Sequence, residues 1–289
     1  MKYLITLKPL EPFMFGGDQT FGTLGDKEAG SYLVKSQQFP QQTALLGMLR
    51  KELMTQAGLL TRKRKGEWVD KHKKVDAGNL VGYEKVNMKK REKQNLGAIN
   101  SLSPVFLMQK GKRYIQKVDI DSFSYVHGKL EGYSSKSDIY DNFVSLDGAK
   151  KLSSANIFKS IEQTGNKKGG KDNSLFKKTS YIFKDGFHFA CYVDIDYDLE
   201  DSIVTLGADQ SAFMMSVIKD DSSLSYVDTN GYLTLLSDAY ITVDIKSHAT
   251  FAITSEISHR NLKNKKTALK SHNTLFEKSE TLYLYEKGS

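Results

Sequence analysis

The sequence contains side chains that could do acid–base chemistry, but they follow none of the common catalytic or metal-binding patterns. There is no Walker-type phosphate loop, no Gly-x-Gly-x-x-Gly and no Gly-x-Ser-x-Gly motif. A metal-free ribonuclease needs only a positioned base and a cation for the phosphate, so catalysis stays open. The six histidines share no metal-ligand spacing: His72, His127, His188, His248, His259 and His272. We expect His188, in an apolar run, to be structural, and His127, His248 and His259 to be the candidates for a base.

Metal and cofactor chemistry find little support. Cys191 is the only cysteine, so an internal disulfide or a thiolate cluster cannot form. Its apolar neighbours indicate a small buried residue of a strand, and a single cysteine favours a cytoplasmic location. Five acids between 194 and 201 lack the central Gly and the closing Glu of a calcium loop, which favours a solvated turn. We therefore predict no metal and no cofactor.

The charge balance favours a polyanionic partner. The chain carries 42 Lys and Arg against 34 Asp and Glu, a net charge of +8. Basic residues are densest from Arg62 to Lys93, which is either a phosphate-contacting surface or a solvated helical hairpin. A second basic stretch, Thr164–Ser174, combines three Gly with three Lys and predicts an exposed loop.

Two stretches combine glycines with apolar residues, which indicates that their backbone comes close to another backbone or to a ligand. The segment 9–22 holds two Pro and three Gly, so it cannot continue a strand or a helix. It also carries Phe13 and Phe15, which is typical of a structured loop. Either aromatic could be a core residue or a platform for stacking a base. Gly207-Ala208 forms a second small-residue turn, between two strand-like runs of 204–217.

A helix is predicted between these two glycine-containing stretches in the sequence. Thr43 is a good N-cap residue and Gly58 a good stop, so we predict a helix over Thr43–Ala57. Gly47 interrupts its apolar stripe at a cost of roughly 1 kcal/mol relative to Ala, which indicates that a backbone or a ligand comes close. The stripe itself follows helical spacing: Ala44, Leu45, Met48, Leu49 and Leu53.

The remaining chain reads as many strands with few helices, without βαβ regularity, which predicts an α+β fold. No apolar run approaches the length of a membrane helix. We expect one domain over 1–198, with a basic insertion near 60–95, and a second over 199–289. The chain ends soon after its last predicted strand, which indicates that it is incomplete at its C-terminus. The predicted elements are a strand over 2–8, a hairpin over 104–118, a short helix from Ser153, a hairpin of 179–184 with 187–194 around Asp185-Gly186, two strand-like runs in 231–243 and a strand over 281–285.

Three stretches together resemble one family. Residues 8–16, Lys-Pro-Leu-Glu-Pro-Phe-Met-Phe-Gly, are similar to the first loop of RAMP proteins, the RNA-binding subunits of CRISPR effector complexes. Residues 39–50, Phe-Pro-Gln-Gln-Thr-Ala-Leu-Leu-Gly-Met-Leu-Arg, resemble the family's Phe-Pro-x-x-Thr-x-x-Gly-x-Leu/Ile-Arg helix start. Residues 206–213 resemble its glycine-rich loop, with Ala208 where a second Gly is usual. The order is most like the subunit that caps the 5′ handle of the guide RNA (crRNA) in type III-B (Cmr) complexes.

This resemblance implies a ferredoxin-like fold in both domains, with a projecting thumb hairpin, and a non-catalytic, cytoplasmic subunit. Its partners would be the crRNA 5′ handle and other Cmr-complex subunits, among them the large polymerase-like subunit and the backbone RAMP subunit. The alternatives are a metal-independent RAMP endoribonuclease that processes precursor crRNA, and a pure protein-interaction subunit. The RNA-binding residues would be Phe13, Phe15, Gly16, Gly17, Gln38, Thr43, Gly47, Arg50, Lys167, Lys168, Lys171, Gly207 and Ala208.

Overall fold

The chain divides into two compact units, each of which is described by itself. Unit 1 comprises residues 1–115 and 141–227, and unit 2 comprises 116–140 and 228–289. The structure is a computed structural model that describes residues 1–16, 19–21, 32–64, 67–69, 74–83, 86–90, 92–118, 123–132, 142–166, 175–207, 209–224, 232–259, 262–264, 276–278 and 281–289.

A nine-stranded sheet forms the centre of unit 1. Strand β1 lies in its middle, antiparallel to β15 on one side and to β17 on the other. Alternating apolar residues of β1 face the core, as a half-buried strand requires. Along the sheet the order is β12 (Lys151–Ser153), β11 (Asn142–Ser145), β8 (Lys112–Gln116), β7 (Phe106–Gln109), β15 (His188–Ile195), β1 (Lys2–Pro9), β17 (Ser211–Lys219) and β16 (Ser202–Leu206), and β6 (Ile99–Leu102) also pairs with β15.

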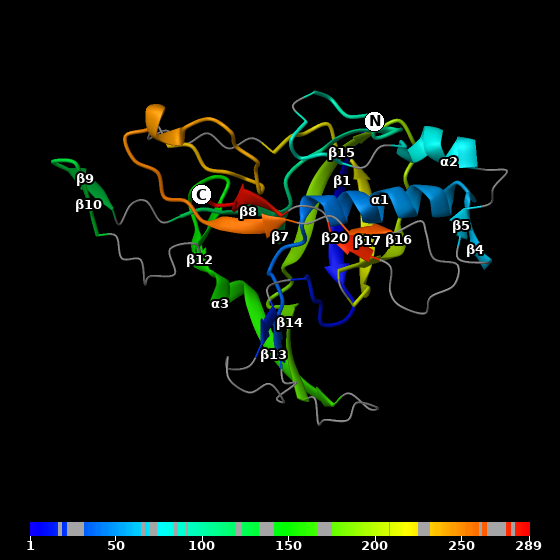
Figure 1. Cartoon of the computed structure of the whole chain (residues 1–289), viewed down its shortest axis with the longest axis horizontal. Helices are drawn as coiled ribbons and strands as arrows, with labels where there is room; N and C mark the ends of the chain where they lie inside the picture. Colours follow the sequence, from blue (N-terminus) through cyan, green and yellow to red (C-terminus); the bar gives the residue numbers. More distant parts are fainter. Residues whose placement is uncertain are drawn as a thin grey trace. The chain divides into compact units, whose positions relative to one another are not determined.

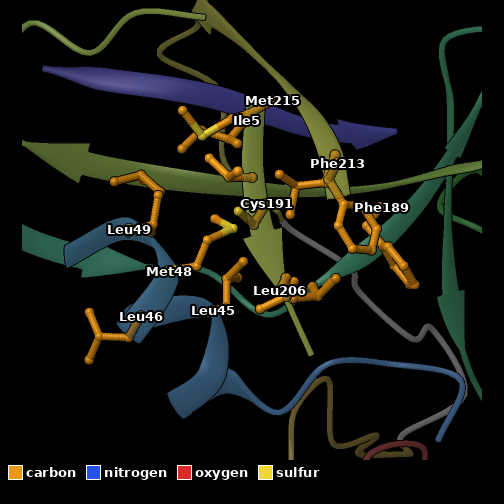
Figure 2. Packing of buried hydrophobic residues seen from close by; sticks show 14 of the residues in the cluster. Ile5, Leu45, Leu46, Met48, Leu49, Phe189, Cys191, Leu206, Phe213 and Met215 are labelled. Atoms are coloured by element: carbon orange, nitrogen blue, oxygen red, sulfur yellow. The ribbon is translucent and has the colours of Figure 1, made fainter. Parts of the chain in front are cut away.

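Helix α1 (Gln42–Gln56) packs its apolar stripe against this sheet (Figure 2). Leu45, Leu49 and Leu53 are fully buried. They share one hydrophobic cluster with Ile5 of β1 and Cys191 of β15. The other helices among the described residues are short: α2 (Lys74–Val81), α3 (Ser154–Ile157) and the 3₁₀ helix η3 (Ile245–Ser247) of unit 2.

A second sheet of unit 1 contains a long hairpin, β13–β14, that projects away from the central sheet (Figure 1). Its two strands pair over nine residues each, and β3 adds to β14 in parallel. The sheet consists of β13 (Phe158–Asn166), β14 (Leu175–Phe183), β3 (Tyr32–Lys35) and β2 (Gln19–Phe21), and a separate small hairpin pairs β4 (Leu60–Arg64) with β5 (Glu67–Val69).

The described part of unit 2 is made of short strand pairs. In its first hairpin, Tyr125 stacks on Phe251, with ring centroids 5.4 Å apart. The pairs are β9 (Ser124–Val126) with β10 (Lys129–Glu131), β18 (Glu256–His259) with β21 (Leu282–Tyr285), and β19 (Leu262–Asn264) with β20 (Phe276–Lys278).

These elements confirm the predicted α+β class, since the sheets are mostly antiparallel and the helices few. The strands expected over 2–8, 104–118 and 204–217 are present. The hairpin predicted around Asp185-Gly186 is wrong. The turn forms, with φ of 49° at Asp185 and 74° at Gly186. It joins β14 to β15, however, and these two strands lie in different sheets. The strands predicted in 231–243 are also absent from the described residues 232–243, which hold only a bridge from Ala239 to Tyr285.

The domain division predicted at 198/199 lies within unit 1. Strands β16 and β17 follow that position in the chain, yet β17 pairs with β1 over seven residues, so the central sheet continues across it. Of the basic stretch 62–93, the structure describes residues 62–64, 67–69, 74–83, 86–90 and 92–93, which include β5 and α2. Across the described residues, no helix is long and apolar enough to cross a membrane.

Candidate nucleic-acid interface

The N-terminus of α1 begins one residue earlier than predicted, and its cap is different. Gln41 is the N-cap residue. Its backbone is extended, with φ of −63° and ψ of 144°, and its side chain makes no capping hydrogen bond. Its carbonyl accepts hydrogen bonds from the N–H groups of Ala44 and Leu45, at 2.9 and 3.1 Å. Thr43 therefore lies in the first helical turn, half-exposed, and the prediction of Thr43 as the cap is wrong. These are the first bonds of the helix itself, so the side chain of Gln41 takes no part in capping.

A strip of exposed residues runs along the side of α1 that faces away from the core. Its members recur three or four positions apart, so they lie on one side of the helix. At Gly47 no atom of the described chain lies within 4 Å of the place where a Cβ would stand. The protein itself does not need a glycine here, so this backbone is open to a partner. The strip consists of Ala44, Gly47, Lys51 and Thr55.

Two basic side chains lie one turn beyond Gly47. Arg50 is half-buried, and this burial lowers the pKa of its guanidinium below the usual value. An arginine stays protonated under such a shift, so Arg50 brings a positive charge to this face. The Nζ atom of Lys51 donates a hydrogen bond to Oγ1 of Thr205 in β16, at 3.1 Å. This contact joins the exposed strip of α1 to the end of β16.

The β16–β17 turn meets the loop that follows β1. Gly207 has a φ of +94°, and a Cβ at this residue would lie 2.3 Å from the carbonyl oxygen of Met14. Only glycine allows two backbones to approach this closely with that φ. The contact places Gly207 against Met14 and Phe15, the residues just before Gly16, and Gly16 is exposed, with no described atom within 4 Å of the place where a Cβ would stand. The two glycine-containing stretches that the sequence singled out thus meet in the structure, through Gly207 and Met14.

Further bonds hold the turn and the loop in place. The carboxylate of Glu11 accepts from the N–H of Ala212 at 2.8 Å, and Asp209 forms an ion pair with Lys178 of β14. On the other side of the loop, the N–H of Phe15 donates to Oγ of Ser36 at 2.9 Å. We call the surface formed by the exposed residues Gly16, Gly47, Lys51 and Asp209 and the half-buried Arg50 and Gly207 the glycine rim. It presents open backbone beside basic side chains, a combination suited to nucleotides.

Phe13 and Phe15 are not part of this surface. Their exposed fractions are 0% and 3%, so neither ring has a free face for a base. The ring of Phe13 lies 5.2 Å from Phe183 and 5.3 Å from Phe189. Of the two roles considered for these aromatics, the structure supports the core, and their assignment as RNA-binding residues is wrong. The loop turns both rings inward because the aromatic cluster under the β13–β14 hairpin buries more of their surface.

Of the other predicted RNA-binding residues, Gln38 lies away from the glycine rim, and five lie outside the described residues. Gln38 is half-buried, and its amide nitrogen donates to Oγ of Ser154 in α3 at 2.5 Å. It therefore lies with α3 and not on the glycine rim. Gly17, Ala208, Lys167, Lys168 and Lys171 lie outside the described residues.

Sequence reasoning missed three rim or rim-supporting residues: Lys51, Lys178 and Asp209. Lys51 could have been found, because it follows Gly47 by one helical turn. Asp209 lies in the glycine-rich stretch 206–213, but its partner Lys178 is distant in the chain, so nothing local identified the ion pair.

Residues 5–116 match the family model of the CRISPR-associated protein Cas_Cmr3. This stretch of the chain is similar to the Cmr3 family of CRISPR-associated proteins. The matched part holds β1, the loop with Gly16, helix α1 and the β7–β8 hairpin. Among solved structures, this chain is similar to a chain in a cryo-EM structure of the Type III-B Cmr-beta bound to cognate target RNA, with 16% sequence identity and a TM-score of 0.49. That similarity covers 100% of this chain and 85% of the other. No curated protein matches.

Proposed function

We propose that this protein is an RNA-binding subunit of a type III-B CRISPR effector complex and that it holds the 5′ handle of crRNA. The observation that carries the proposal is the Cas_Cmr3 match over residues 5–116, because it includes the Phe39–Arg50 helix start. In this proposal, the partners are crRNA and other Cmr subunits, including the polymerase-like and backbone RAMP subunits. The fold is the ferredoxin-like RAMP fold, supported by β1, α1 and an antiparallel sheet.

The geometry of the glycine rim supports this function. Single-stranded RNA is recognised with its bases splayed out and through phosphate and 2′-OH contacts, which need open backbone and cations close together. Gly16 and Gly47 leave their backbone uncovered, and Arg50 and Lys51 supply positive charge one helical turn from Gly47. Phosphates would lie at the first turn of α1, where backbone N–H groups and the helix dipole favour an anion.

We propose that the subunit is not catalytic. General acid–base cleavage of RNA requires a base within hydrogen-bond reach of the reacting hydroxyl. The glycine rim, as far as the chain is described, contains no histidine. His188 lies in β15 with its Nδ1 3.2 Å from the carbonyl oxygen of Gly186, and His127 lies in the β9–β10 turn of unit 2. The metal-independent endoribonuclease therefore remains the second candidate function, and the described residues of the glycine rim offer it no histidine as a general base.

The direct test incubates the purified chain with labelled RNA that carries a repeat-derived 5′ handle, in EDTA, and measures binding and cleavage over a range of salt. We expect binding that weakens steeply with salt, and intact RNA. Cleavage in EDTA that disappears when a histidine is replaced would establish the endoribonuclease instead. No RNA binding, alone or with partner subunits, would leave a protein-interaction subunit.

Arg50→Ala tests the rim itself. Removing one phosphate contact should lower the affinity for handle RNA and reduce the slope of log K against log salt by roughly 0.7. Circular dichroism and the urea midpoint serve as folding controls. A well-folded variant with the same salt slope as the native chain would remove Arg50 from the interface.

A further inference from the structure

A basic groove lies at the same end of the central sheet as the glycine rim, on the other side of β15 and β1. It has a volume of about 520 Å³, within the range of ligand sites. Three separate turns contribute to it: β7–β8, β11–β12 and β14–β15. Its lining residues are Gln109, Lys110, Lys112, Tyr114, Lys150 and Asp185.

Hydrogen bonds between the turns fix the shape of the groove. The side-chain amide of Gln109 donates to the main-chain oxygen of Asp185 at 3.0 Å, which ties β7 to the β14–β15 turn. The N–H of Leu146 donates to the carbonyl of Arg113 at 3.0 Å, and the N–H of Lys150 donates to Oγ of Ser145 at 2.9 Å. These bonds hold the three turns together, so the turns bring Lys110, Lys112 and Lys150 to the same groove.

The positive charge of the groove is only partly neutralised. Lys112 pairs with Asp147 at 3.7 Å, but both side chains are more than half exposed, so the pair is weak. In the part of the chain that the structure describes, the ammonium groups of Lys110 and Lys150 have no carboxylate within 4 Å. Cations gathered in a concave site concentrate the potential that attracts an anion.

We propose that this groove binds phosphates of the single-stranded RNA held at the glycine rim, independently of sequence. This inference rests on the proposed function. Tyr114 is buried, with 1% exposed, so the groove has no ring on which to stack a base. The register Leu7↔Phe189 puts the end of β1 beside the start of β15, at the groove's end of the sheet. The groove and the Gly207 turn are then three strand spacings apart, roughly 15 Å, which a few nucleotides span.

The test compares the native full-length chain with a triple variant, Lys110→Ala, Lys112→Ala and Lys150→Ala, by fluorescence anisotropy. The probes are the handle RNA and a scrambled RNA of equal length. We expect affinity for both RNAs to fall about tenfold or more at 0.1 M salt, and the salt slope to fall by about 2. The control removes three exposed lysines elsewhere: Lys2→Ala, Lys129→Ala and Lys159→Ala. Equal effects of the two triple variants would overturn the groove proposal.

The same data separate the two proposals. If the native chain binds both RNAs equally, handle recognition is wrong, while a specific loss in the groove variant still supports the groove. Asp185→Asn should change RNA affinity in the opposite direction, because it removes a negatively charged carboxylate from the groove lining. Asn tolerates the positive φ of 49° at this position, and affinity should rise roughly threefold. An unchanged or lower affinity in a folded Asp185→Asn variant would count against the proposal.

Lysine acetylation of the native chain locates the contact without any substitution. RNA should protect Lys110 and Lys150, and leave Lys129 as reactive as before. An acidic peptide of Glu residues is the competing probe. Protection of the groove lysines by the peptide but not by RNA would assign the groove to a protein partner and overturn the inference.

Discussion

At the residue scale, Gly47 and Gly207 show two different reasons for a glycine. Gly47 has a helical backbone and open space around it, so no feature of the protein's own fold requires it. Gly207 combines a φ of +94° with a carbonyl oxygen at 2.3 Å from an added Cβ, so the fold itself requires it. Substitutions at the two positions should therefore have opposite effects on stability.

Gly47→Ala should raise the free energy of unfolding by about 0.5–1 kcal/mol, because alanine restricts the unfolded chain and fits the helix. Gly47→Gln should also fold, and its longer side chain should weaken binding of handle RNA if the RNA passes over this strip. Urea unfolding and anisotropy measure the two effects. Thr55→Gln, two turns further along the strip, is the matched control. A Gly47→Gln variant with native affinity would place the RNA elsewhere.

Gly207→Ala should lower the free energy of unfolding by about 2 kcal/mol or more, since the new Cβ meets backbone and the positive φ becomes strained. The displaced loop after β1 should also reduce RNA affinity. Urea unfolding gives the first value and anisotropy the second. A Gly207→Ala chain as stable as the native one would contradict the close approach to Met14.

The sequence could predict these glycines but not the fate of the aromatics beside them. A glycine that breaks a stripe is visible in one segment, as at Gly47. Whether Phe13 faces solvent or core depends on Phe183 and Phe189, which are distant in the chain. The same limit explains why Lys178 and Asp209 were not found.

At the element scale, the aromatic cluster joins the β13–β14 hairpin to the central sheet. Phe13 lies between the two: it bridges to Tyr181 of β14 through a pair of backbone hydrogen bonds and contacts Phe213 of β17. The turn at Asp185-Gly186 leads from this hairpin into β15. Local turn chemistry predicted that turn correctly, but strand pairing is decided by long-range packing, so the predicted partners were wrong.

Phe13→Ala should cost about 3–5 kcal/mol of stability, because it leaves a cavity among packed rings. Phe13→Leu fills more of that cavity and should be less destabilising. Urea unfolding of both variants tests the prediction. A base-stacking role would give the opposite pattern, a loss of RNA affinity with the stability unchanged.

At the scale of the whole molecule, chain order and spatial order differ. Residues 116–140 belong to unit 2 although unit 1 lies on both sides of them in the sequence. The predicted boundary at 198/199 falls among acidic residues. Those acids instead secure unit 1: Asp198 accepts a hydrogen bond from the hydroxyl of Tyr3 at 2.8 Å, and Asp201 accepts one from the N–H of Val217 at 2.7 Å. A polar turn in the sequence can thus close a sheet as well as end a domain.

The rate at which the thiol of Cys191 is labelled should report on the unfolding of unit 1. Cys191 is fully buried in β15, with β1 paired alongside, and burial raises the pKa of its thiol to about 12. At pH 8 only about one thiol in ten thousand would be ionised, so iodoacetamide should react with the native chain far more slowly than with the unfolded chain. Its labelling should rise with urea along the same transition as circular dichroism. Handle RNA should slow the labelling, since a ligand that binds only the folded state reduces opening. Rapid labelling in native buffer would mean that β15 is not at the centre of a closed core.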